Sequence, residues 1–159
     1  MKKNIAIIMG GYSSEYLISL KSGSVVYDCL PKASYNAYCI HIFKDKWVYV
    51  ADDLTEHPVN KADFSIVVAG SKINFDCVFN AIHGSPGEDG TIQAILDTAG
   101  AKYTHSSMLV SAVCMNKVLT KRICASVGIS VVKDTTCEVQ NLTTVEIAMP
   151  YVVKPIADG

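Results

Sequence analysis

The chain has 159 residues, of which 50% are apolar, and its formal net charge is −1 at pH 7. This length and composition suit one soluble α/β body whose sheet is covered on both faces by helices. The near-zero charge and the scattered lysines and arginines argue against nucleic-acid binding, and no apolar run is long enough to span a membrane. We expect no signal peptide, and the six cysteines show no CxxC spacing, so the sequence predicts free, buried thiols in a cytoplasmic protein.

The amino-terminal residues have the pattern of a buried strand that turns into a helix. Residues 4–9 form an apolar run, two adjacent glycines mark a turn, and Ser13 or Ser14 is a candidate helix cap. Two glycines without a third do not form the GxGxxG fingerprint of dinucleotide binding. Glu15 falls in the first helical turn, where an acid either serves a ligand or complements the helix dipole. The predicted apolar face of this helix comprises Leu17, Leu20, Val25 and Leu30.

The next part of the chain predicts a strand followed by an antiparallel excursion. Residues 35–43 alternate as a strand does, and residues 46–50 are expected to pair with them across a turn. Residues 51–75 contain several turn-forming residues and predict a variable connection without chemistry. Of the two histidines in this part, His57 is expected at the surface and His41 in the packed core.

The sequence HGSPGEDG at residues 83–90 is the most informative stretch. It follows the apolar run 77–82, which predicts a buried strand, and it precedes a helical pattern. A helix cap accounts for Asp89, and the helix dipole accounts for Glu88, but neither accounts for His83 at the end of a strand. The loop therefore indicates a binding site for a polar molecule. It does not indicate a metal site, because it offers too few metal-coordinating side chains and their spacing matches no known metal motif. Positive φ angles and close approach of the backbone are expected at Gly84, Gly87 and Gly90.

Two helices are predicted after this loop, beyond a short strand at residues 100–104. The first spans residues 106–114, and the second runs from Lys117 to a glycine at its end, Gly128. The apolar face of the second helix comprises Val118, Leu119 and Ile123.

The pattern then changes to antiparallel strands with an intervening helix. Strands are predicted over residues 131–139 and 150–155, with a weak helix over residues 143–148 between them. Lys154, near the end of the second strand, is either an exposed edge lysine or a cation that holds phosphate. The change of pattern predicts a domain boundary near residue 115.

Taken in this order and spacing, these motifs resemble the D-alanine-D-alanine ligase family of the ATP-grasp superfamily. The resemblance covers nearly the whole chain except residues 44–75, and HGxxGEDG is its most specific part. The matching residues are Gly10-Gly11, Ser14-Glu15, Ser19-Leu20, His83-Gly84, Gly87-Glu88-Asp89-Gly90, Gln93, Tyr103-Thr104, Lys117, Lys121, Gly128 and Val153-Lys154-Pro155.

The resemblance implies a Rossmann-like, parallel-sheet pre-ATP-grasp domain over residues 1–115 and the first part of an α+β ATP-grasp domain over residues 116–159. It implies the ligation of two D-alanines with ATP and Mg2+, through an acyl phosphate, to give the dipeptide of peptidoglycan. It also implies a homodimer, and it places the metal ligands outside these residues.

The same resemblance assigns roles to single residues. Glu15 resembles the catalytic and substrate-binding acid that receives the ammonium group of the first D-alanine, and His83 resembles its neighbour in that pocket. Lys117 and Lys154 resemble the pair that contacts the phosphates of ATP. The loop-shaping residues are Gly84, Gly87, Glu88, Asp89 and Gly90.

The chain departs from the family pattern in several places. Tyr16 stands where a basic residue is common, Asn116 replaces an Asp, and His105 begins a stretch that replaces a glycine-containing turn. In the family, a serine-rich phosphate loop and the magnesium carboxylates follow the position of Gly159, so we expect these residues alone to have no ligase activity. The alternative is a non-catalytic amino-acid-binding domain or a relic of the same fold. D-lactate or D-serine as the second substrate also remains open.

Overall fold

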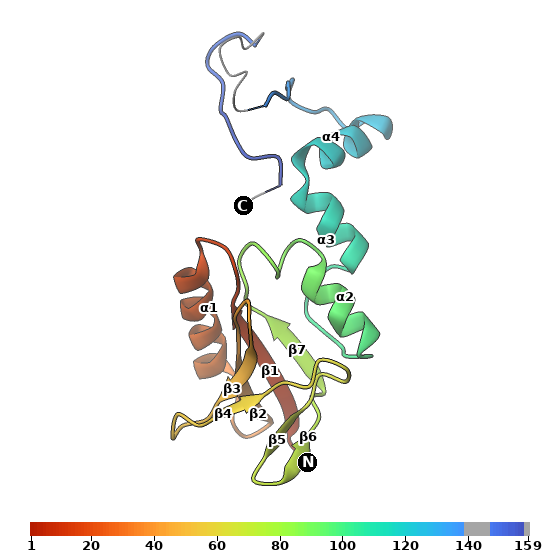
Figure 1. The fold of residues 1–159 in the computed structure, drawn as a ribbon. Helices are drawn as coiled ribbons and strands as arrows, with labels where there is room; N and C mark the ends of the chain where they lie inside the picture. Colours follow the sequence, from red (N-terminus) through yellow and green to blue (C-terminus); the bar gives the residue numbers. More distant parts are fainter. Residues whose placement is uncertain (139–146, 158–159) are drawn as a thin grey trace.

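The fold is seen in a computed structural model, which describes residues 1–138 and 147–157. Figure 1 shows a sheet with helices on its two sides, followed by two helices that lead away from it. In chain order the elements are β1 (Lys3–Gly10), α1 (Tyr16–Cys29), β2 (Tyr35–Ile42), β3 (Trp47–Val50), β4 (Glu56–Pro58), β5 (Ile66–Val68), β6 (Ser71–Ile73), β7 (Cys77–Asn80), α2 (Thr91–Thr98), α3 (Met108–Met115) and α4 (Lys117–Ser126).

The main sheet has the strand order β4-β3-β2-β1-β7. The central strand β1 pairs in parallel with both β2 and β7, and β3 and β4 extend the sheet in antiparallel fashion. This confirms the predicted α/β fold with a parallel sheet and the predicted pairing of residues 46–50. The short strand expected at residues 100–104 is reduced to one parallel bridge, between Tyr103 and Val78.

The sheet is buried on both faces, as a strand with a continuous apolar sequence requires. On one face Ile7 and Met9 of β1 belong to a cluster against which α1 packs. On the other face Ile8 of β1 belongs to a cluster with Ile92 and Leu96 of α2. The alternation of side chains along β1 thus sends neighbouring residues to opposite layers.

Residues 51–75 are more than the variable connection that the sequence predicts, because they cover one face of the sheet. They contain β4, which extends the main sheet, and the hairpin of β5 and β6. Val59, Phe64 and Ile66 of this segment are buried in the same cluster as Leu96, and Phe64 is 1% exposed. The excursion is therefore part of the core.

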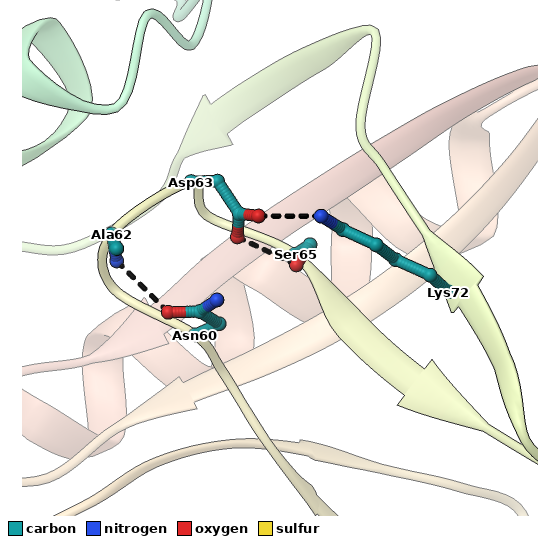
Figure 2. Close-up of polar contacts among 5 residues, drawn as sticks. All are labelled: Asn60, Ala62, Asp63, Ser65 and Lys72. Atoms are coloured by element: carbon teal, nitrogen blue, oxygen red, sulfur yellow. Dashed lines mark hydrogen bonds and ion pairs between the residues drawn. The ribbon is translucent and has the colours of Figure 1, made fainter.

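A network of polar contacts fixes the turn that carries Phe64 (Figure 2). Asp63 accepts hydrogen bonds from Ser65 and from the ammonium group of Lys72, both at 2.6 Å, and Asn60 accepts one from the Ala62 N–H at 3.1 Å. Phe64 itself has a φ of 50°, in the left-handed region. These local contacts hold a conformation that is unfavourable for an aromatic residue.

Helix α1 packs closely through small residues, which the predicted apolar face does not include. Its buried residues are Ser19 and Gly23, and a Cβ on Gly23 would lie 2.9 Å from Cβ of Met9. The predicted face is wrong at Leu17 and Val25, which are exposed. It is confirmed at Leu20 and Leu30, which pack against the sheet.

The predicted serine caps of α1 are wrong. Glu15 occupies the N-cap position, and its side chain makes no capping hydrogen bond. The Ser13 hydroxyl accepts a hydrogen bond from the Glu15 N–H at 3.2 Å and donates one to the His83 carbonyl at 2.8 Å. Instead of capping α1, the Ser13 side chain thus connects the start of this helix to the loop that carries His83.

The described residues beyond Ser107 form two helices and irregular chain. Helices α3 and α4 confirm the prediction of two helices, but α4 buries no residue, and its predicted apolar face is exposed at Leu119 and Ile123. Lys121 of α4 forms an ion pair with Asp134 at 3.0 Å. Among the described residues, no helix is long and apolar enough to cross a membrane.

The strands predicted after Ile129 are wrong wherever the structure describes them. Residues 131–138 and 150–155 form no strand. An extended segment needs a partner for its N–H and C=O groups, and neither segment pairs with another described strand. Of the predicted helix, residues 143–146 lie outside the described residues, and residues 147 and 148 are not helical.

The predicted burial of histidines and cysteines is only partly confirmed. His41 is half-buried and stacks on Phe43, with ring centroids 6.2 Å apart, and His57 stacks on Tyr49 and is half-buried as well. All six cysteines are free, as expected, but three are exposed. Burial first, and then the charges of Asp28 and Asp52, raise the pKa of Cys39 to about 11.

Candidate functional site

Two loops meet at the carboxyl ends of the neighbouring parallel strands β1 and β7. The first comprises residues 11–15 and the second residues 81–90. The Tyr12 N–H donates to the Ser85 carbonyl at 2.8 Å, and the Ser13 hydroxyl donates to the His83 carbonyl at 2.8 Å. The carboxyl edge of a parallel sheet is where α/β folds bind ligands, so the joined loops form the candidate site.

The Glu15 carboxylate lies beside the loop that carries His83. A Cβ added to Gly84 would be 2.7 Å from Cβ of Ser13 and 3.8 Å from Oε2 of Glu15. The Glu15 carboxylate therefore lies beside the residue that follows His83. Both side chains are half-buried, so each keeps one side open to a ligand. A half-buried carboxylate beside this loop suits a ligand that carries an ammonium group.

A hydrogen bond from α1 fixes the imidazole ring of His83. Nε2 of His83 lies 3.0 Å from the hydroxyl oxygen of Ser22. No other hydrogen bond of the His83 ring is present among the described residues. The ring is thus held at one nitrogen, and Nδ1 is left for a ligand.

The Glu88 side chain forms a hydrogen bond within the second loop. Its carboxylate accepts a hydrogen bond from the Gly84 N–H at 2.7 Å. The Gly84 carbonyl in turn accepts from the N–H groups of Gly87 and Glu88, at 2.8 and 2.9 Å. Gly84 has a φ of 68°, a conformation that glycine adopts without strain. The loop is therefore preorganised by its own residues.

Asp89 caps the beginning of α2 by accepting a hydrogen bond from the Thr91 N–H at 2.9 Å. Burial would raise the pKa of Asp89, but hydrogen bonds from Ser85 and Thr91 outweigh burial and hold it below its usual value. Gly90 takes the expected positive φ, at 91°, whereas Gly87 does not. Gly87 is needed for space instead, because a Cβ there would lie 2.5 Å from Cβ of Ile82.

Two side-chain amides hold the second loop in place through the Gly87 carbonyl. The Gly87 carbonyl accepts from Nδ2 of Asn80 at 2.8 Å and from Nε2 of Gln93 at 2.6 Å. Gln93 is fully buried, and its Nε2 also lies 3.0 Å from Nδ1 of His105. His105, one of the departures from the family pattern, thus connects the loop to the chain that precedes α3.

The two lysines expected at a nucleotide site lie in the later part of the chain. Lys117 is the first residue of α4, and its N–H donates to the Ile156 carbonyl at 2.9 Å. This bond brings the segment that carries Lys154 to the start of α4, and Lys154 is exposed there. Asn116 occupies the N–H groups of Val118 and Leu119 through its side-chain oxygen, so these amides do not bind phosphate.

The described residues do not fit a magnesium ion. No group of three or more His, Cys, Asp or Glu side chains that could hold a metal occurs among them. Magnesium needs an octahedral set of oxygen ligands, and the carboxylates of Glu88 and Asp89 already accept hydrogen bonds from the backbone. What the site offers is one carboxylate and one imidazole on a fixed backbone.

The sequence alone did not predict the roles of three serines that build this site. Ser13 joins the loops, and Ser22 holds the His83 ring. Ser19 is fully buried, where its hydroxyl accepts from the Gly10 N–H and donates to the Ala81 carbonyl, both at 2.8 Å. One signal was available: Ser19, Ser22 and Gly23 are three and four residues apart, the spacing of one helical face.

Comparisons with known proteins show what this chain is similar to. The family model described as D-ala D-ala ligase N-terminus matches residues 4–106. The D-alanine--D-alanine ligase of Flavobacterium johnsoniae is 58% identical over 115 residues, which cover 72% of this chain and 36% of that protein. The D-alanine--D-alanine ligase of Parabacteroides distasonis is 37% identical over 165 residues, which cover 100% of this chain and 50% of that protein. The chain therefore spans between a third and a half of these curated relatives.

A solved structure shows the same fold. The D-alanine--D-alanine ligase from Bacillus anthracis, solved in complex with ATP, superposes with a TM-score of 0.59 at 32% identity, over 80% of this chain and 38% of that one. The likeness includes the sheet that positions the two joined loops.

Proposed function

Because the chain belongs to the D-alanine-D-alanine ligase family, we propose that its protein uses ATP to join two D-alanines for peptidoglycan synthesis. One observation carries the proposal: residues 11–15 and 81–90 are joined at the carboxyl ends of β1 and β7, and the Glu15 carboxylate lies beside Gly84, the residue that follows His83. A zwitterionic amino acid carries an ammonium group that the Glu15 carboxylate complements in charge.

Glu15 is the residue that receives the ammonium group of the first D-alanine. Its carboxylate lies beside Gly84 and is half-buried, so an ion pair with a bound amine is partly shielded from water. His83 orients the same substrate from the other loop. Both side chains sit on a backbone that is fixed before the substrate arrives, which lowers the entropic cost of orienting it.

The later residues contribute to the nucleotide site in this proposal. Lys117 and Lys154 offer positive charge to the phosphates of ATP, which supplies the phosphoryl group for activation of a carboxylate. Residues 1–115 act as the amino-acid-binding domain, and residues 116–159 belong to the domain that binds ATP. Since the described residues do not fit Mg2+, its ligands come from other parts of the enzyme. We also place the protein in the cytoplasm, as a homodimer.

A chimaeric enzyme tests the proposal. Residues 4–106 of this chain replace the matching segment of the Flavobacterium johnsoniae ligase, and phosphate release from ATP is measured with and without D-alanine. We expect D-alanine-dependent release. Glu15→Gln should lower kcat/KM by about 100-fold, because it removes a charge-assisted contact with the ammonium group.

The matched control is Asp52→Asn, which removes an exposed carboxylate outside both loops. It should leave kcat/KM unchanged. A folded chimaera that releases no phosphate, or one whose activity survives Glu15→Gln, would show that the joined loops do not serve this reaction.

A further inference from the structure

One face of α1 is polar where it meets the sheet. Ser19, Ser22 and Gly23 occupy neighbouring positions on this face. Ser19 bonds to the ends of β1 and of the chain after β7, and Gly23 lets the helix approach Met9 closely. These contacts set the distance between α1 and the sheet, and they place the Ser22 hydroxyl 3.0 Å from Nε2 of His83.

The direction of this hydrogen bond follows from the other partners of Ser22. A serine inside a helix commonly donates to the carbonyl four residues before it, as Ser24 does to Leu20 at 3.0 Å. The Ser22 hydroxyl has no such bond, and its only partner among the described residues is His83. The proton of the Ser22 hydroxyl forms a hydrogen bond to a described residue only if Ser22 donates to Nε2 of His83. An N–H at Nε2 would instead leave this proton without an acceptor among the residues that the structure describes.

We propose that Ser22 is a positioning residue that donates to Nε2 of His83 and thereby fixes the neutral imidazole as the Nδ1–H tautomer. The nitrogen opposite Ser22 then presents a hydrogen-bond donor to the ligand. Such a donor complements an oxygen of a bound amino acid, as Glu15 complements its ammonium group. The inference rests on the proposed amino-acid site, and it adds which ring nitrogen serves that site and what selects it.

The tautomer is measured directly by long-range 15N–1H correlation NMR of this chain without ligand, with the His83 ring in its neutral form. The chain has four histidines, and the spectrum of His83→Gln assigns the His83 signals by their absence. We expect the 15N shifts of His83 to show a protonated Nδ1 and an unprotonated Nε2. Shifts that show a protonated Nε2 would overturn the proposal.

Three variants separate positioning from general stability. Ser22→Ala removes the donor, so the His83 shifts should move toward the average of the two tautomers. Ser22→Thr keeps a hydroxyl and should keep the Nδ1–H pattern. Ser24→Ala, which removes a hydroxyl from the exposed side of the same helix, should also leave the pattern unchanged. Identical His83 shifts in wild type and Ser22→Ala would contradict the role of Ser22.

Titration with D-alanine then distinguishes this inference from the proposed function. We expect Ser22→Ala to weaken D-alanine binding by about tenfold, the value of one hydrogen bond, and Ser22→Thr to restore it. If the tautomer pattern is as expected but D-alanine binds to no variant, the proposed function fails and the positioning by Ser22 stands. If D-alanine binds equally to wild type and Ser22→Ala, the positioning role fails and the site stands.

Discussion

Helices α2 and α3 have the same length, eight residues each, but very different environments. The sequence of α3, MLVSAVCM, is the more apolar of the two, and yet Ser111 is its only buried residue. The less apolar α2, TIQAILDT, buries Ile92, Gln93 and Leu96. Leu96 is 0% exposed and Leu109 of α3 is 67% exposed. Apolar composition therefore does not determine burial in this chain.

The difference lies in the layers around each helix. Helix α2 packs on a face of the sheet that Phe64 also covers, and side chains there are surrounded on all sides. Helix α3 follows the end of the sheet, and no described strand lies beneath it. The part of the chain up to the end of α2 is thus organised by a two-sided core, and the candidate amino-acid site is built on that organised part.

The test with the largest expected effect on stability truncates one leucine in each of these two helices. Leu96→Ala should lower the free energy of unfolding by about 2–5 kcal/mol, because it leaves a cavity in a packed core. Leu109→Ala should change it by no more than about 0.5 kcal/mol, because an exposed side chain loses few contacts. Urea denaturation of both variants gives the two values. Similar losses in the two variants would refute the contrast between the helices.

A second test removes a buried hydroxyl that joins the strand ends. Ser19→Ala leaves the Gly10 N–H and the Ala81 carbonyl without partners, so we expect a loss of about 2–4 kcal/mol in unfolding free energy. Ser24→Ala, on the exposed side of α1, removes one hydrogen bond within the helix and should cost less than about 0.5 kcal/mol. Thermal and urea unfolding provide the comparison. A neutral Ser19→Ala variant would show that water replaces the hydroxyl.

A third test compares two glycines that both have positive φ. Gly84→Ala places a Cβ 2.7 Å from Cβ of Ser13, so strain and overlap together should cost about 2–3 kcal/mol and disturb the site. Gly128 has no atom within 4 Å of an added Cβ, so Gly128→Ala should cost only the strain, about 1 kcal/mol. Equal losses would mean that the contact with Ser13 relaxes without cost.

The smallest expected effect concerns His41 and acid pH. Burial lowers the pKa of His41 below its ordinary 6.5, and the charge of Glu56 opposes this shift only in part. The folded protein then binds fewer protons at this site than the unfolded chain does, so stability falls as the pH drops from about 6.5 toward the folded pKa. His41→Gln should flatten the stability profile in this window, as measured by urea denaturation at a series of pH values. An unchanged profile would contradict this assignment.

The sequence correctly predicted the features of the fold that depend only on residues near one another in the chain. The apolar run of β1 and the glycines of HGSPGEDG need only their neighbours to specify a strand and a loop, and both are found, although Gly87 does not take the predicted positive φ. The predicted pairing of residues 46–50 with β2 is correct for the same reason, since a short turn connects them.

What the sequence did not predict depends on contacts between distant residues. Ser22 and His83 are 61 positions apart, and no local pattern indicates their hydrogen bond. The burial of Ser19 and Gly23 in place of Leu17 follows from the close approach of α1 to β1. The strand predicted over residues 131–139 is absent from the part that the structure describes, residues 131–138, because β propensity alone provides no neighbouring strand for pairing.

The central claim is that the two joined loops form a binding site for D-alanine, and NMR titration of the chain with D-alanine tests it most directly. We predict saturable shifts of backbone amide signals confined to residues 11–15 and 81–90, much weaker shifts with L-alanine, and a loss of the shifts in Glu15→Gln. An absence of shifts in these loops, or shifts that persist unchanged in Glu15→Gln, would contradict the account.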